Sequence, residues 1–128
     1  MNGKYLMALL WTIFVVILSA ISGNTASKLM VVDFFGIDKL GHAFFYFVMT
    51  WLWLRAFSIK SMSHRIFSYA FLISFFVGYV MELGQKFWFE GRSFEYDDMV
   101  ANTFGALLAT WMYYTFIFKQ RLANIKDQ

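Results

Sequence analysis

The sequence predicts an all-α integral membrane protein, a four-helix bundle with both termini in the cytoplasm. Hydrophobic residues make up 60% of the 128 positions and charged residues only 15%, so the chain has more apolar surface than a small soluble domain can bury. Four nearly uncharged stretches approach the roughly 17 to 25 residues that a bilayer-spanning helix needs. The basic residues flank these stretches unevenly, which indicates an orientation.

The four predicted helices span residues 5–22, 40–57, 66–88 and 99–118 and form a single domain over 1–128. The first stretch has an alternative interpretation as a signal peptide, because Lys4 precedes an apolar run that ends in small residues. That run stays uncharged through Ser27 and three further stretches follow it. A first transmembrane helix is therefore the preferred interpretation.

Lys and Arg residues set the predicted orientation. With a cytoplasmic N-terminus, the inner side would hold seven of the 11 basic residues: Lys4, Arg55, Lys60, Arg65, Lys119, Arg121 and Lys126. The positive-inside rule then places both termini in the cytoplasm. The net charge of +3 accordingly indicates the lipid bilayer as a partner and no nucleic acid. The chain has no cysteine, which excludes disulfides and thiolate chemistry.

Polar residues gather at the predicted outer ends of three helices. At 1.5 Å per residue, Glu82 would lie about 26 Å along its helix from Arg65, within an apolar slab about 30 Å thick. Helical spacing places these residues on one face of each helix. The three faces are Asp38, His42, Tyr46, Met49 and Trp53; Gly78, Glu82 and Gln85; and Asp98, Asn102, Gly105 and Ala109. Ionisable groups in a membrane face inward, so we expect one polar pocket open to the outside.

An enzymatic hypothesis assigns acid and base roles within this pocket. Glu82 or His42 would be the general base and Asp98 the orienting carboxylate. The residues expected to bind substrate are Asp38, Lys39, Gln85, Arg92, Asp97 and Asn102. The alternative is a non-enzymatic protein in which the cluster is a hydrogen-bonded structural core or a ligand pocket. In that case Asp97 or Asp98 caps the last helix, and the sequence leaves open whether the protein is an enzyme.

His42, Glu82 and Asp98 would also make a ligand set of one histidine and two carboxylates. No two of them occupy a recognised short motif such as HExxH. The sequence therefore predicts no metal and no cofactor.

An ordered set of motifs resembles the VanZ-like family of small bacterial membrane proteins. It runs from Asp38-Lys39-Leu40-Gly41-His42 through Tyr46, Glu82, Arg92 and Asp97-Asp98 to Asn102 and Gly105-Ala106, roughly residues 38–110. The resemblance implies a small helical bundle in the bacterial cytoplasmic (inner) membrane and a role at the cell envelope. The family's namesake is associated with resistance to the glycopeptide teicoplanin. A lipid-linked, amphipathic or glycopeptide ligand on the outer face is the partner that this implies.

Overall fold

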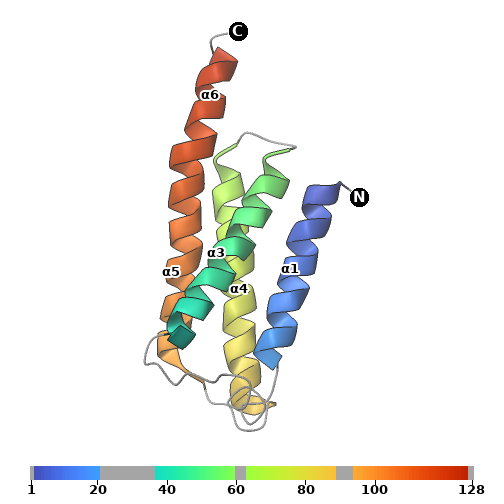
Figure 1. The fold of residues 1–128 in the computed structure, drawn as a ribbon, viewed down its shortest axis with the longest axis vertical. Helices are drawn as coiled ribbons and strands as arrows, with labels where there is room; N and C mark the ends of the chain where they lie inside the picture. Colours follow the sequence, from blue (N-terminus) through green and yellow to red (C-terminus); the bar gives the residue numbers. More distant parts are fainter. Residues whose placement is uncertain (1, 21–36, 60–62, 89–93, 127–128) are drawn as a thin grey trace.

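The computed structural model describes residues 2–20, 37–59, 63–88 and 94–126, and these ranges contain helices and no strand. Helix α1 spans Gly3–Ala20, α3 Ile37–Phe57, α4 Arg65–Phe87 and α5 Tyr96–Tyr113. The last helix continues directly through a π-helical segment, η1, at Tyr114–Phe118 into α6 at Lys119–Lys126. Figure 1 shows these elements running side by side along the long axis of the molecule. The all-α prediction is confirmed.

The observed boundaries correct the prediction most at the fourth helix. It begins at Tyr96 rather than at residue 99 and remains helical to Lys126 rather than ending at 118. Glu95 occupies the N-cap position without a side-chain capping hydrogen bond, and Asp97 and Asp98 lie in the first turn. The predicted capping role of either aspartate is therefore wrong. Acidic residues in a first turn are still favourable, since the helix N-terminus carries partial positive charge.

Helix α3 holds the bundle together, since it contacts α1, α4 and α5 and packs most extensively against α5. The closest approach lies at Gly105 of α5. A Cβ at this position would come within 2.8 Å of the carbonyl carbon of Ala43 and 3.0 Å of its Cα. Only glycine allows this backbone contact, as the small residues of this face predicted.

Hydrogen bonds between helices fix their rotation near mid-bundle. Thr50 Oγ1 donates to Ser74 Oγ at 2.8 Å and joins α3 to α4. The indole N–H of Trp53 donates to Thr12 Oγ1 at 3.1 Å, and that of Trp11 donates to the Phe45 carbonyl at 3.1 Å. Both tryptophan bonds join α1 to α3, so the indoles act as packing residues with a satisfied polar atom.

The π-helical segment η1 brings two large side chains to the same face. Tyr113 is 2% exposed and Phe118 is 0% exposed, and both belong to a core with Leu54, Ile66 and Ala70. Five residues of regular α-helix would separate the two side chains by about 140°. The wider π turn, in which the Lys119 N–H bonds the Tyr114 carbonyl, reduces that separation.

The two ends of the bundle differ in chemistry. One end, here the polar end, contains Lys39, His42, Glu82 and Asp98, near the start of α3, the end of α4 and the start of α5. The opposite end, the basic end, contains the start of α1, the end of α3, the start of α4, and α6 (Figure 1). Within the described ranges, α1 and α4 are long and apolar enough to cross a membrane. The other two long helices, α3 and α5, do not meet the same test of length and hydropathy.

Candidate functional site

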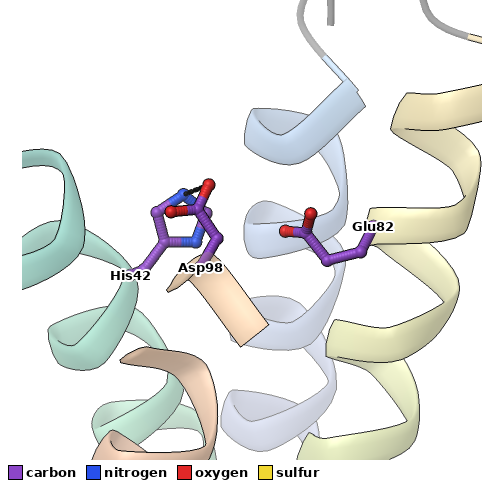
Figure 2. A group of neighbouring side chains, drawn as sticks. All are labelled: His42, Glu82 and Asp98. Atoms are coloured by element: carbon purple, nitrogen blue, oxygen red, sulfur yellow. Dashed lines mark ion pairs between the residues drawn. The ribbon is translucent and has the colours of Figure 1, made fainter. Parts of the chain in front are cut away.

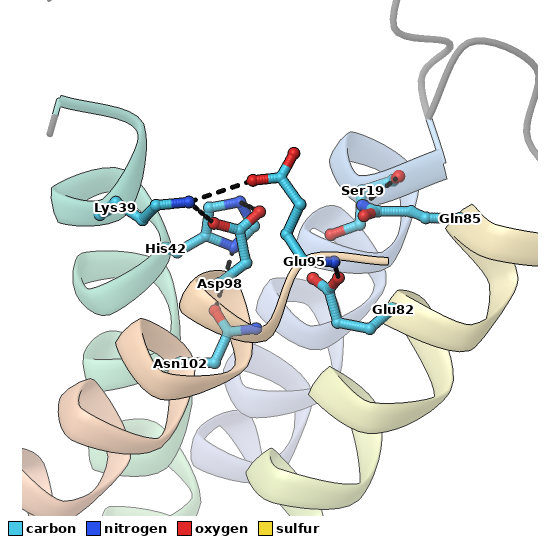
Figure 3. A network of polar contacts seen from close by, with 8 residues as sticks. All are labelled: Ser19, Lys39, His42, Glu82, Gln85, Glu95, Asp98 and Asn102. Carbon is cyan, nitrogen blue, oxygen red and sulfur yellow. Dashed lines mark hydrogen bonds and ion pairs between the residues drawn. The ribbon is translucent and has the colours of Figure 1, made fainter. Parts of the chain in front are cut away.

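Three helices contribute side chains to a buried cluster at the polar end. Helix α3 supplies Lys39 and His42 from successive turns, α4 supplies Glu82, and α5 supplies Asp98 and Asn102 (Figure 3). The exposed fractions are 1% for Glu82 and 4% each for Asp98 and Asn102. The helical spacing that predicted one inward polar face on each helix is thus borne out for His42, Glu82, Asp98 and Asn102.

Asp98 is the centre of the ionic contacts. Its Oδ1 lies 2.6 Å from the Lys39 ammonium, and its Oδ2 lies 3.4 Å from Nε2 of His42. A buried carboxylate is tolerated only when nearby charges and donors offset its lost hydration. Lys39 supplies that charge while remaining 34% exposed, so Asp98 connects the buried cluster to a cation at its rim.

His42 is held from both sides of its ring. Nδ1 lies 3.0 Å from Oδ1 of Asn102, and Nε2 faces Asp98. The doubly protonated imidazolium can donate to both oxygens, whereas a neutral ring can donate to only one. His42 therefore joins Asp98 and Asn102, which lie one turn apart on α5.

Glu82 connects α4 to the start of α5. Its Oε2 accepts a hydrogen bond of 3.2 Å from the backbone N–H of Glu95. Figure 2 shows its carboxylate directed toward the His42 and Asp98 pair. One turn earlier on α4, Gly78 leaves room for the Tyr46 side chain. A Cβ at Gly78 would lie 3.1 Å from the Tyr46 ring.

The trio His42, Glu82 and Asp98 has the donor atoms of a cation site. One ligand atom from each residue lies within 4.8 Å of the others. A tetrahedral zinc shell with bonds of about 2.0 to 2.1 Å has donor atoms roughly 3.3 Å apart. The His42 and Asp98 atoms meet that spacing, but Glu82 would have to move inward, and Lys39 already neutralises Asp98. The set fits a tetrahedral zinc ion only after this rearrangement.

Other residues predicted to bind substrate lie at or beyond the edge of the cluster. Gln85 is 2% exposed and donates from Nε2 to the Ser19 carbonyl of α1 at 3.2 Å. Asp97 is exposed beside the buried Asp98. Asp38 lies in the first turn of α3, but its side chain is outside the described atoms, and Arg92 lies outside the described residues.

Two contact residues of this site were not among the predicted ones. Glu95 lies 3.2 Å from the Lys39 ammonium, and its backbone bonds Glu82. Its position three residues before Asp98 was a usable signal, because residues three apart share a helix face. Ser19 contributes its backbone carbonyl to Gln85, and no sequence pattern marks such a contact.

Comparison with known proteins identifies a family but no relative of known structure. No curated protein and no solved structure matches the chain. A family model described as VanZ/LLP1 matches residues 4–119. The match extends the resemblance seen at residues 38–110 to the first helix and includes every residue of the buried cluster. The chain therefore belongs to the VanZ/LLP1 family.

Proposed function

We propose that this protein spans the bacterial cytoplasmic membrane with all four long helices and has both termini in the cytoplasm. Family membership and the two apolar helices α1 and α4 support a membrane protein. Large apolar side chains also remain exposed along the helices, among them Leu10, Ile17, Phe76 and Leu107, as expected of a lipid-facing surface. The basic residues gather at the end that we assign to the cytoplasm.

Cysteine labelling tests this topology cleanly, because the chain has no native cysteine. Asp97→Cys and Gln120→Cys introduce thiols at exposed positions of the polar and basic ends. We expect a membrane-impermeant thiol reagent to label the first in intact cells and the second only after permeabilisation. The reverse pattern would show the opposite orientation. Labelling of both positions in intact cells would contradict the four-span arrangement.

We further propose that the polar end binds a lipid-linked or amphipathic molecule on the outer face. The observation that carries this proposal is the position of an apolar groove beside the buried cluster. The groove lies between α4 and α5, has a volume of about 790 Å³, and is lined by residues that include Leu83, Val100, Phe104 and Leu107. Leu83 is adjacent in sequence to Glu82, so the groove and the cluster share the same turns of helix.

The groove is itself amphipathic along its length. Lys86 and Tyr96 line it at the polar end, and Leu107 lines it about 16 Å deeper along α5. A molecule with an apolar chain and an anionic head group would place the chain along Phe104 and Leu107 and the head group near Lys86. The carboxylate of Glu82, one turn before Lys86, would then be within reach of the head group.

In an enzymatic version of this function, Glu82 is the preferred general base. Both ring nitrogens of His42 already face oxygen atoms of Asn102 and Asp98, so accepting a substrate proton would first break one of these contacts. His42 and Asp98 would then position the site. Glycopeptide resistance is the cellular effect that such handling of an envelope molecule would produce.

Replacement of Glu82 by glutamine tests the chemical role. Glu82→Gln keeps the shape and the acceptor oxygen for the Glu95 N–H but removes the negative charge. We expect an altered teicoplanin response or envelope lipid profile with protein abundance unchanged. Glu82→Asp keeps the negative charge and is the matched control, and it should stay closer to the wild type in both measurements. If Glu82→Gln cells contained abundant protein and showed an unaltered response, the proposed chemical role of Glu82 would be wrong.

A second candidate is a structural network that acts through packing alone. It is favoured by the finding that, among the described residues, no buried side-chain nitrogen or oxygen lacks a hydrogen-bond partner. Satisfied polar networks fix how membrane helices pack. Under this function Glu82→Gln would reduce the amount of folded protein, and any change in the cell would follow that loss.

A further inference from the structure

A second cavity lies at the basic end, opposite the buried cluster. Its volume is about 260 Å³. The residues that line it, here called the basic pocket, are Lys4, Trp51, Arg55, Tyr113, Ile117 and Arg121. The cavity is several times larger than the roughly 30 Å³ that one water occupies in the liquid, so it has room for a phosphate group.

The positive charges of the basic pocket come from three separate elements. Lys4 lies in the first turn of α1, Arg55 in the last turn of α3, and Arg121 in α6. None of the six lining residues is acidic, and the ion pairs between described residues lie at the polar end. Cations that line one cavity repel one another, and an anion between them would offset that repulsion.

The remaining walls of the pocket are aromatic and aliphatic. Tyr113 is 2% exposed, and its hydroxyl lies 2.7 Å from Ser58 Oγ. The Trp51 ring packs edge-on against Tyr113, with centroids 5.2 Å apart. These contacts hold the aromatic wall in place, and Ile117 adds a further apolar surface. The pocket therefore combines a cationic rim with a preformed apolar wall.

We propose that the basic pocket binds the phosphate head group of an anionic phospholipid from the leaflet that borders this end. Guanidinium groups match phosphate oxygens with paired hydrogen bonds, and Lys adds a point charge. The apolar wall formed by Trp51 and Ile117 suits the glycerol and first methylenes of a lipid, which a free phosphate ion lacks. The proposal uses the membrane location proposed above but is independent of chemistry at Glu82.

Native mass spectrometry of the full-length protein in detergent tests this proposal. The probes are short-chain phosphatidylglycerol, phosphatidylcholine with the same chains, and inorganic phosphate. We expect phosphatidylglycerol to bind roughly tenfold or more tightly than phosphatidylcholine. The double variant Arg55→Gln/Arg121→Gln should lose this preference. Equal binding of the two lipids, or inorganic phosphate competing as well as phosphatidylglycerol, would overturn the proposal.

Matched variants separate the pocket from general charge and from folding. Arg65→Gln/Lys119→Gln removes two cations of the same end that do not line the cavity, and it should retain the lipid preference. Arg55→Lys/Arg121→Lys keeps the charges and should retain most of the binding. An unchanged melting temperature of the glutamine variant would exclude simple misfolding. Equal losses in the two glutamine variants would show a diffuse surface effect and contradict a pocket. Glu82→Gln should bind phosphatidylglycerol as the wild type does. A failure of the outer-face proposal would therefore leave this binding measurement unchanged.

Discussion

The polar end and the basic end of this bundle treat charge in opposite ways. At the polar end, Asp98 is buried and contacts Lys39 and His42, so its charge is offset within the chain. At the basic end, Lys4, Arg55 and Arg121 surround a cavity whose described lining contains no acid. The comparison shows that charges at the polar end are paired within the protein. The charges at the basic end are complementary to an anion that is not part of the protein.

The close contact between α3 and α5 underlies the polar end, and its loss should have the largest effect. Gly105→Ala would drive a methyl group into the Ala43 backbone and separate His42 from Asp98 and Asn102. We expect about 3 kcal/mol of destabilisation, seen as a lower melting temperature in detergent.

Gly41→Ala is the matched control for this substitution. An added Cβ at Gly41 meets no described atom within 4 Å, and alanine is the better helix former. We expect no loss of stability. If Gly105→Ala melted at the same temperature as Gly41→Ala, the close contact would not be what holds the polar end together.

Removal of the Asp98 charge should have the next largest effect. Asp98→Asn leaves Lys39 and His42 without their shared carboxylate, and we expect a loss of about 2 kcal/mol. This is less than the 3 to 5 kcal/mol typical of breaking a fully buried pair, because Lys39 remains partly exposed. Asp97→Asn, at the exposed neighbour, should stay within about 0.5 kcal/mol of the wild type. Equal effects at 97 and 98 would contradict the central position of Asp98, with denaturant unfolding as the measurement.

A smaller effect is expected at the basic end from Tyr113→Phe. The substitution keeps the aromatic wall but removes the hydroxyl that contacts Ser58, which should cost about 1 kcal/mol. Thermal unfolding of Tyr113→Phe combined with Asp98→Asn sharpens the comparison. Asp98 and Tyr113 are about 22 Å apart along α5, so the two effects should add. A clearly non-additive double variant would indicate that the ends are coupled.

The smallest effect is expected from metal removal. Lys39 already neutralises Asp98, and Glu82 is too distant from the His42 and Asp98 atoms to complete a zinc shell without moving. A chelator should therefore leave the melting temperature of the purified protein unchanged. A melting temperature that falls in chelator and recovers with zinc would show that a bound metal ion stabilises the polar end.

Helical periodicity predicted much of the buried cluster. A repeat of 3.6 residues placed Tyr46 and Met49 of α3, Gly78 and Glu82 of α4, and Asn102 of α5 on inward faces, and all are buried. This succeeds because the spacing of polar residues along a helix is a property of the sequence alone. The roles assigned to Glu82 and His42 in catalysis stay predictions.

Other features depend on how the helices meet and could not be predicted. Gln85 was expected beside the cluster, but its partner is a backbone carbonyl at Ser19, reached only once α1 is packed. The residue before the start of α5 at Tyr96 is fixed by Glu82, whose carboxylate accepts the Glu95 N–H. Both are tertiary contacts with partners far away in the sequence.

The π-helical turn at Tyr114–Phe118 sets how α6 is rotated about the helix axis relative to α5. If η1 became regular α-helix with no change in chain length, everything beyond it would rotate by roughly 100° relative to α5. Helix content would hardly change. Arg121 would point away from the cavity that it now shares with Arg55, so the helix type of this one segment determines where a charge lies.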